Sequence, residues 1–115
     1  MNIIKDVVID YLNAQHAYDH CRDIILKNKG QKKFYVGATK DLDERAKDHL
    51  DEKGMTNMIV LCKCPTKCKT ESLEKKLIKR FNSDSIYNKC INQTGGGEGL
   101  KDGVNYIYVL FNWII

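Results

Sequence analysis

The sequence contains no apolar run close to the ~20 residues that a membrane-spanning helix requires, which argues against an integral membrane protein. Its first ten residues include Lys5, Asp6 and Asp10, charges that the apolar part of a secretory signal peptide lacks. It also has no GxxxxGKS/T phosphate-binding loop and no internal repeat. These absences leave a non-exported globular domain as the starting hypothesis.

Cysteine is present in an odd number, five, and without an export signal. This usage predicts reduced thiols in an intracellular compartment, the cytoplasm or the nucleus. Cys62, Cys64 and Cys68 do not show the paired CxxC spacing of structural zinc sites, although zinc is an alternative. Because Cys62 and Cys64 would share one face of a strand, we expect them to pack as small hydrophobic side chains.

Length and charge limit the remaining options. The 115 residues predict a single domain with a modest core. The formal net charge of +4 and the pI near 8.8 favour an anionic partner, but a solvated, lysine-rich surface would give the same totals. Composition therefore allows nucleic acid as a partner without requiring it.

Apolar periodicity divides the chain into helices and strands. Residues 4–28 carry apolar side chains at three- and four-residue steps before Gly30, which predicts one long N-terminal helix. His16 and His20 could bind a metal from this helix, but exposed histidines with acidic neighbours are the simpler interpretation. The other expected elements are strands at 32–37, 58–64 and 104–111, helices at 41–52 and 70–81, and a loop at 82–103 rich in asparagine, serine and glycine.

Two local signals set element borders. Asp41 is expected to be the N-cap of its helix, with Glu44 three residues later as a capping-box partner. The strand at 58–64 is apolar on both faces and ends before Pro65, the only proline in the chain. These features suit an interior strand of a sheet.

The segment 34–50 combines a short strand with the start of a helix. On a helical wheel, Arg45 and His49 lie one turn apart at the edge of the apolar stripe. The preceding strand delivers Tyr35 toward the same point. A phenol, a guanidinium and an imidazole are therefore expected to lie close together.

One carboxylate falls within the apolar stripe of its helix. Glu74 lies in the middle of the stripe of helix 70–81, where a carboxylate is costly unless it is paired or bound to a cation. Alternatively, it reaches the rim of the stripe and pairs with an outward-facing lysine. The residues alone leave both interpretations open.

Taken in order, these positions resemble the GIY-YIG nucleases, which include homing endonucleases, restriction enzymes, and repair and branch-resolving nucleases. Tyr35-Val36-Gly37 is similar to the second half of the family signature, and Arg45 and His49 match the helix positions that follow it. Glu74 matches the metal-binding glutamate, which would explain its place on an apolar stripe. Asn88 matches the family asparagine, with Asn92 before the glycine run as a rival.

The resemblance covers about residues 32–111 and implies an α+β fold. It predicts a small three-stranded antiparallel sheet flanked by helices. The single domain 1–115 would then consist of an added N-terminal helix (1–30) and a GIY-YIG-like catalytic core (31–115).

The first motif of the family, a GIY strand about ten residues before Tyr35, is missing from its expected place. Residues 106–110 resemble that strand instead. We therefore predict a circular permutation in which the C-terminal strand lies beside residues 33–36 and Tyr108 replaces the first-motif tyrosine. Alternatively, this strand is only structural, or it is donated to a second copy of the chain.

The resemblance implies hydrolysis of DNA phosphodiester bonds, with Mg²⁺ or Mn²⁺ bound to Glu74. Arg45 would bind the phosphate, while Tyr35 or Tyr108, with a lowered pKa, would orient the attacking water and take its proton. His49 would assist proton movement or hold a phosphate. The residues expected in catalysis are Tyr35, Arg45, His49, Glu74, Asn88 and Tyr108, and those expected to bind nucleic acid are Lys40, Lys47, Asn92, Gly95 and Gly96.

Substrate preference is not specified by the sequence. Branched or single-stranded DNA is a candidate, and a protein partner or a homodimer could contribute to recognition. The main alternative function is a nucleic-acid-binding module that keeps the scaffold without cutting, which the missing first strand would explain. A protein-interaction domain built on the N-terminal helix is a third hypothesis.

Overall fold

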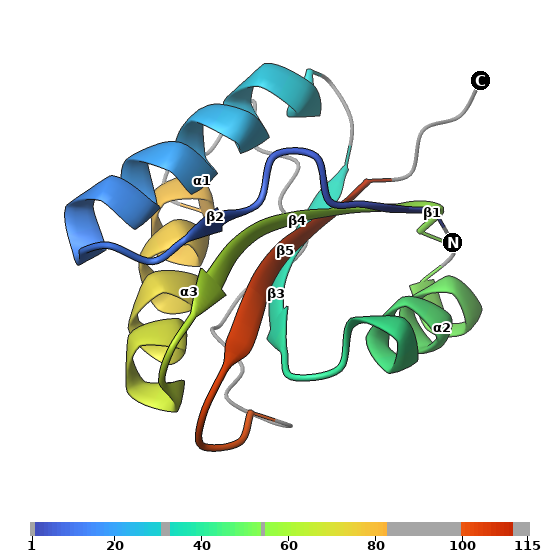
Figure 1. Ribbon diagram of the computed structural model, residues 1–115. Coiled ribbons are helices and arrows are strands. Elements are labelled where there is room, and N and C mark those ends of the chain that lie inside the picture. Colours follow the sequence, from blue (N-terminus) through green and yellow to red (C-terminus); the bar gives the residue numbers. More distant parts are fainter. Residues whose placement is uncertain (1, 31–32, 54, 83–99, 112–115) are drawn as a thin grey trace.

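The computed structural model describes residues 2–30, 33–53, 55–82 and 100–111, and of residues 49–53 the backbone only. One sheet separates helices α1 and α3 on one face from α2 on the other (Figure 1). This arrangement confirms the α+β class. The elements are β1 (Asn2–Ile4), β2 (Ile9–Asp10), α1 (Ala14–Lys29), β3 (Phe34–Thr39), α2 (Leu42–Lys53), β4 (Asn57–Cys64), α3 (Lys67–Asn82) and β5 (Asn105–Phe111).

The sheet has the strand order β1-β4-β5-β3, and β2 also pairs with β4. Strand β5 lies between β3 and β4 and is antiparallel to both, which confirms the predicted three-stranded antiparallel core. It also confirms the expected neighbourhood of the C-terminal strand and residues 33–36. The parallel strands β1 and β2 extend the sheet beyond β4 and were not predicted.

The prediction of one helix over residues 4–28 is wrong, and so is the description of residues 1–30 as a helix. Helix α1 begins at Ala14, because the side chain of Asn13 caps it by accepting a hydrogen bond of 2.9 Å from the His16 amide. The apolar spacing before Asn13 mimics a helix, but these residues instead place β1 and β2 on the open edge of β4. Tertiary pairing thus overrides a local periodicity.

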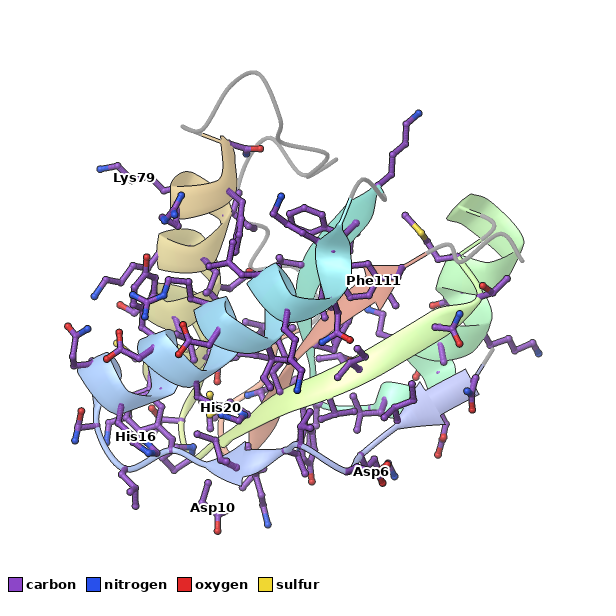
Figure 2. All side chains as sticks on the ribbon, turned by 90° about the horizontal axis from the view of Figure 1, so that it is seen from above. Asp6, Asp10, His16, His20, Lys79 and Phe111 are labelled. Carbon is purple, nitrogen blue, oxygen red and sulfur yellow. The ribbon has the colours of Figure 1, made fainter. Side chains whose placement is uncertain are left out.

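The interpretation of His20 as an exposed histidine is also wrong. Its Nε2 lies 2.7 Å from the carbonyl oxygen of Val7, and the side chain is half-buried. Figure 2 shows both histidines on α1, and His16 is exposed as expected. His20 therefore ties α1 to the segment that joins β1 and β2.

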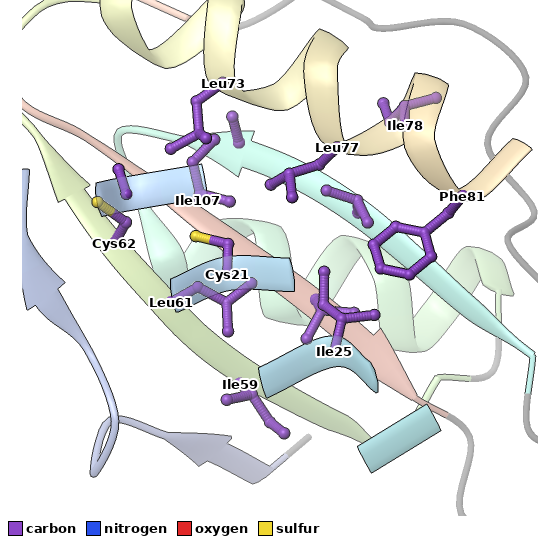
Figure 3. Packing of buried hydrophobic residues seen from close by; sticks show 14 of the residues in the cluster. Cys21, Ile25, Ile59, Leu61, Cys62, Leu73, Leu77, Ile78, Phe81 and Ile107 are labelled. Atoms are coloured by element: carbon purple, nitrogen blue, oxygen red, sulfur yellow. The ribbon is translucent and has the colours of Figure 1, made fainter. Parts of the chain in front are cut away.

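The larger part of the core lies between the sheet and the two helices α1 and α3 (Figure 3). Ala17, Cys21 and Ile25 of α1 are buried there, so the apolar face of this helix is used for packing. The rings of Phe34 and Phe81 meet edge to face with centroids 5.2 Å apart. Among the described residues, no helix is long and apolar enough to cross a membrane.

Cys62 and Cys64 are buried on one face of β4 in this core, as predicted. Hydrogen bonding to Cys21 and burial raise the pKa of Cys62 to about 12. Hydrogen bonding to Cys62 and burial also raise the pKa of the Cys64 thiol. Both thiols are therefore protonated at neutral pH and behave as core side chains.

The second, smaller core lies between the sheet and α2, and its buried members are Ala46, Met55, Met58, Tyr108 and Leu110. Helix α2 begins at Leu42, where the Glu44 amide donates 3.1 Å to Oδ1 of Asp41, so the predicted N-cap is confirmed. The Asp41 amide donates a hydrogen bond to Oγ1 of Thr39. In a capping box this amide would donate to the side chain of Glu44, so Thr39 takes the part predicted for Glu44. The strand-to-helix turn is therefore fixed by side chains at both of its ends.

Candidate active site

The two tyrosines predicted for the site lie on the α2 face of the sheet. Phe34 and Val36 of β3 enter the larger core, so Tyr35 points to the opposite face by alternation. Tyr108 of β5 lies on this same face and is 1% exposed. The pairing of β3 with β5 therefore brings the two tyrosines together, although they are 73 positions apart in the sequence.

Gly37 is the residue that makes room for Tyr108. It pairs directly with Tyr108 across the two strands. A Cβ atom built on Gly37 would overlap Cζ and the hydroxyl oxygen of the Tyr108 ring. The tyrosine ring thus lies across the backbone of β3, and only glycine at position 37 permits this placement.

The surroundings of Tyr108 keep its phenol protonated. Burial raises the pKa of Tyr108 far above its ordinary value, and the neighbouring Tyr35 and Glu74 act in the same direction. The positive charge of Arg45 opposes this effect. Tyr35 of β3, Arg45 of α2 and Glu74 of α3 are therefore close enough to Tyr108 of β5 to influence it electrostatically.

Glu74 is buried, with 5% of its surface exposed, so the alternative in which it rises to the rim of its helix is wrong. Burial raises the pKa of Glu74 to about 7; Glu71 adds to the shift, and Arg45 and Lys75 oppose it. Glu74 forms none of the ion pairs found among the described residues. The chain thus keeps a costly carboxylate facing Arg45.

Arg45 is half-buried on α2 and lines a cavity of about 700 Å³, called here the Arg45 cavity. The start of α2 forms one wall, and Lys5, Lys101 and Tyr106 contribute from other parts of the chain. The cavity carries charges of both signs. Its basic side chains are Lys5, Lys40, Arg45 and Lys101, and its acidic side chains are Asp41, Asp43, Glu44 and Asp48.

The other predicted site residues are placed less completely. His49 lies one turn after Arg45 on α2, and only its backbone is described. Lys40 is exposed and lines the Arg45 cavity, whereas Lys47 is exposed on α2 and is not part of that lining. Asn88, Asn92, Gly95 and Gly96 lie outside the described residues.

Sequence reasoning missed two features of the site. It treated Gly37 as part of a motif and gave no reason for it, because the contact with Tyr108 depends on strand pairing. It also gave no role to Lys5, Lys101 or Tyr106. For Tyr106 a signal was present, because it precedes Tyr108 by two residues and therefore shares its face of the strand.

Glu74 is the described residue of this site that could hold a hard divalent cation. Glu74 supplies a buried carboxylate, and no cluster of three or more metal-binding side chains occurs within residues 2–30, 33–48, 55–82 and 100–111. Mg²⁺ is commonly bound through one or two carboxylates, with water and substrate phosphate completing its shell.

Comparison with protein-family models matches residues 24–88 to the GIY-YIG catalytic domain. The chain belongs to the GIY-YIG family. This family consists of endonucleases that act on DNA, so a nuclease-type activity follows at the family level. The comparison with curated proteins and the comparison with solved structures each found no match.

The match contains five of the six residues predicted to act in catalysis, His49 among them, and leaves out one. Tyr35, Arg45, Glu74 and Asn88 fall within residues 24–88, whereas Tyr108 does not. The matched region begins inside α1, in the part of the chain where the first GIY-YIG strand was expected. The central strand of the antiparallel core, β5, is therefore contributed by a segment outside the matched region.

Proposed function

We propose that the protein is a metal-dependent DNA endonuclease that hydrolyses phosphodiester bonds. The observation that carries this proposal is the convergence of Tyr35, Arg45, Glu74 and Tyr108 from four different elements. A domain that only bound nucleic acid would have no need to bury a carboxylate at the cost that its pKa reveals. Family membership supports the same conclusion.

Glu74 is the residue proposed to hold Mg²⁺ or Mn²⁺. The cation, when bound, would neutralise charge on the phosphate and on the leaving oxygen. With a pKa of about 7, the carboxyl of Glu74 is partly protonated at neutral pH, so cation binding would displace a proton. Arg45 would bind a phosphate oxygen pair in a bidentate manner as negative charge develops.

The two tyrosines are proposed to have different roles. The raised pKa of Tyr108 makes it a poor base, so it would act as a neutral phenol that donates a hydrogen bond to the phosphate or to the attacking water. Tyr35 is more exposed than Tyr108, and we propose that it contacts the attacking water. His49 and Asn88 are proposed to assist, in proton movement and in positioning respectively.

We also infer that the family order is circularly permuted. Strand β5 lies in the centre of the antiparallel core, beside the strand that carries the Tyr-Val-Gly motif. Tyr108 faces Tyr35 and Gly37 on the α2 side of the sheet. These positions support a replacement of the first-motif strand by residues 105–111.

The test is an assay of the purified protein on plasmid and branched DNA with Mg²⁺, with Mn²⁺ or with a chelator. We expect metal-dependent cutting that is lost in Glu74→Ala and strongly reduced in Tyr108→Phe. The matched control is Glu71→Gln, which neutralises a carboxylate one turn earlier on α3, where it pairs with Lys67 at 3.9 Å. This control should keep its activity.

Two results would contradict the proposal. DNA binding without cutting under any of the metal conditions would favour the binding module on the same scaffold. Full activity of Glu74→Ala would remove the carboxylate from the chemistry. Full activity of Tyr108→Phe with loss in Glu74→Ala would leave the nuclease but remove the role of β5 in the permuted site.

A further inference from the structure

A second cavity, called here the side cavity, lies next to the Arg45 cavity on the α2 face of the sheet. Its volume is about 300 Å³, and it shares Lys5, Leu42 and Tyr106 with the Arg45 cavity. Ligand pockets range upward from about 300 Å³, so this size suits a single planar ring system. The side cavity is thus adjacent to the cavity that contains Arg45, the proposed phosphate-binding residue.

The walls of the side cavity are mainly apolar. Val8 comes from the N-terminal segment, Leu42 from the start of α2 and Val60 from β4. The half-buried ring of Tyr106 on β5 adds an aromatic surface. A flat, apolar ring system with polar edges, such as a nucleobase, matches these walls, because bases stack on aromatic side chains.

The charged groups lie where the polar parts of a nucleotide would be. Lys5 and Lys63 are exposed and carry amines that suit the phosphates on either side of a base. Asp10 is exposed at the open edge of β2 (Figure 2). Its carboxylate would accept a hydrogen bond from a base N–H and would repel a phosphate inside the cavity.

We propose that the side cavity receives one unpaired nucleobase of the DNA whose backbone crosses the Arg45 cavity. This inference rests on the proposed nuclease function and names its substrate class: DNA with an unpaired nucleotide beside the scissile phosphate, as in a bulge, a flap or a single strand. In a continuous duplex the same base is stacked and paired, and it must be extruded at an energetic cost before it can enter.

The side cavity depends on the N-terminal extension of this chain, because Val8, Ile9 and Asp10 line it. These residues belong to the segment that adds β1 and β2 to the sheet, beside the antiparallel core. The extension therefore does more than lengthen the sheet, because it builds the outer wall of a cavity next to the catalytic residues.

The experiment measures DNA binding in EDTA, so that no cutting occurs. Two DNAs of the same sequence are compared, one fully paired and one with a bulged 2-aminopurine whose fluorescence reports on stacking. We expect the bulged DNA to bind more tightly and its emission to change on binding. Val8→Trp, which fills the cavity, should weaken binding of the bulged DNA about tenfold, the lower range for loss of one base–aromatic stack, and leave the paired DNA unaffected.

Controls separate the cavity from general effects on the protein. Leu12→Trp places the same ring at a side chain that is 72% exposed and lines neither cavity. Lys63→Ala removes a rim amine and should reduce the preference for bulged DNA. Lys79→Ala removes an exposed amine on α3, which Figure 2 shows pointing away from the sheet, and should not.

Equal affinity for bulged and paired DNA would overturn the proposal, as would a preference that survives both Val8→Trp and Lys63→Ala. Equal weakening of both DNAs by Val8→Trp would also overturn it, because the cavity would then not be selective for an unpaired base. Failure of the nuclease proposal gives a different result. In that case the preference and its dependence on Val8 remain, but no cutting follows when Mg²⁺ or Mn²⁺ is supplied.

Discussion

At Glu74, a single carboxylate connects the stability of the fold to the proposed chemistry. The group is buried on a helix whose neighbouring side chains form the core, and burial is the main cause of its raised pKa. The protein therefore retains at this position a residue that weakens the fold. Such a cost is typical of residues retained for chemistry rather than for packing.

The first prediction concerns the stability of the protein without metal. The pKa of Glu74 is about 7 in the native state, against 4.5 for the free side chain, so the native state binds the proton more tightly. This stabilisation is complete below about pH 4.5 and is lost as the pH rises through about 7. Above that pH, Glu74→Gln should exceed wild type in free energy of unfolding by about 1–3 kcal/mol.

Urea unfolding at pH 5 and at pH 8 in EDTA measures this difference. Subtracting the mutant from the wild type removes the contributions of other titrating groups. Glu71→Gln should show a much smaller difference, because this side chain is exposed to solvent to a larger extent. A pH-independent difference between Glu74→Gln and wild type would show that the carboxyl does not titrate differently on folding.

The second prediction concerns Gly37. A methyl group at this position overlaps the ring of Tyr108, so Gly37→Ala must displace that ring and should cost about 1–3 kcal/mol of stability. Activity should fall as well, because the Tyr108 hydroxyl moves. In a Tyr108→Ala background the same substitution should cost far less, which a double-mutant cycle of urea unfolding would reveal.

At the scale of elements, α2 and α3 carry the proposed site residues while α1 serves packing. Arg45 lies on α2 and Glu74 on α3, whereas the buried residues of α1 face the larger core. Each helix is preceded by an N-cap residue whose side chain accepts a hydrogen bond from a backbone amide: Asn13 for α1, Asp41 for α2 and Thr66 for α3. The N-caps of α2 and α3 therefore fix where these helices begin, and with that the positions of Arg45 and Glu74.

The third prediction uses this difference between helices. Asp41→Ala and Asn13→Ala each remove one N-cap and should each lower stability by about 1 kcal/mol. Only Asp41→Ala should reduce activity beyond its effect on stability, since α2 positions Arg45 and α1 carries no proposed site residue. Thermal unfolding and plasmid cutting at a temperature where both variants are folded would separate the two effects. Equal losses of activity would contradict it.

The elements that sequence predicts well are those whose pattern and tertiary role agree. The strand at 58–64 is apolar on both faces and is interior, with neighbours on both sides. The N-terminal 4–28 helix failed because its first residues satisfy a helical spacing and a strand pairing equally well, and only the open edge of β4 decides between them. Local sequence does not contain that information.

The proposed site likewise contains features that local sequence predicts and features that depend on strand pairing. Arg45 and Glu74 could be predicted from helix geometry, because one lies beside an apolar stripe and the other within it. The contact between Gly37 and Tyr108 could not, because it arises from the register of two strands far apart in the chain. The raised pKa of Tyr108 depends on burial and on four other side chains, and it reverses the expectation of a lowered value.

At the scale of the whole molecule, the two ends of the described chain lie at the same level of the sheet, on strands that flank β4. Asn2 and Phe111 both pair with Asn57, on opposite sides of β4. Two strand spacings separate them, about 10 Å. A short linker can therefore join the end of β5 to the beginning of β1 without disturbing either strand.

The fourth prediction follows from this proximity. A rearranged chain that starts at Leu100, continues to Ile115, and joins Met1 through a flexible linker should keep the fold and the activity. Starting at Leu100 retains the hydrogen bonds of Asn105 to the carbonyl oxygens of Lys101 and Gly103. Circular dichroism, urea unfolding and the cutting assay compare it with the natural order. Loss of folding would show that the order of the elements is essential.

The central position of β5 has a consequence for the synthesis of the protein. A growing chain presents β3, α2, β4 and α3 to the cell before the strand that lies between β3 and β4 has been made. Until residues 105–111 leave the ribosome, the two strands have no common partner and Tyr108 is absent from the site. We therefore expect an incomplete chain to be inactive, because it lacks the tyrosine and the strand on which the proposed site depends, and activity to begin only when the sheet is complete.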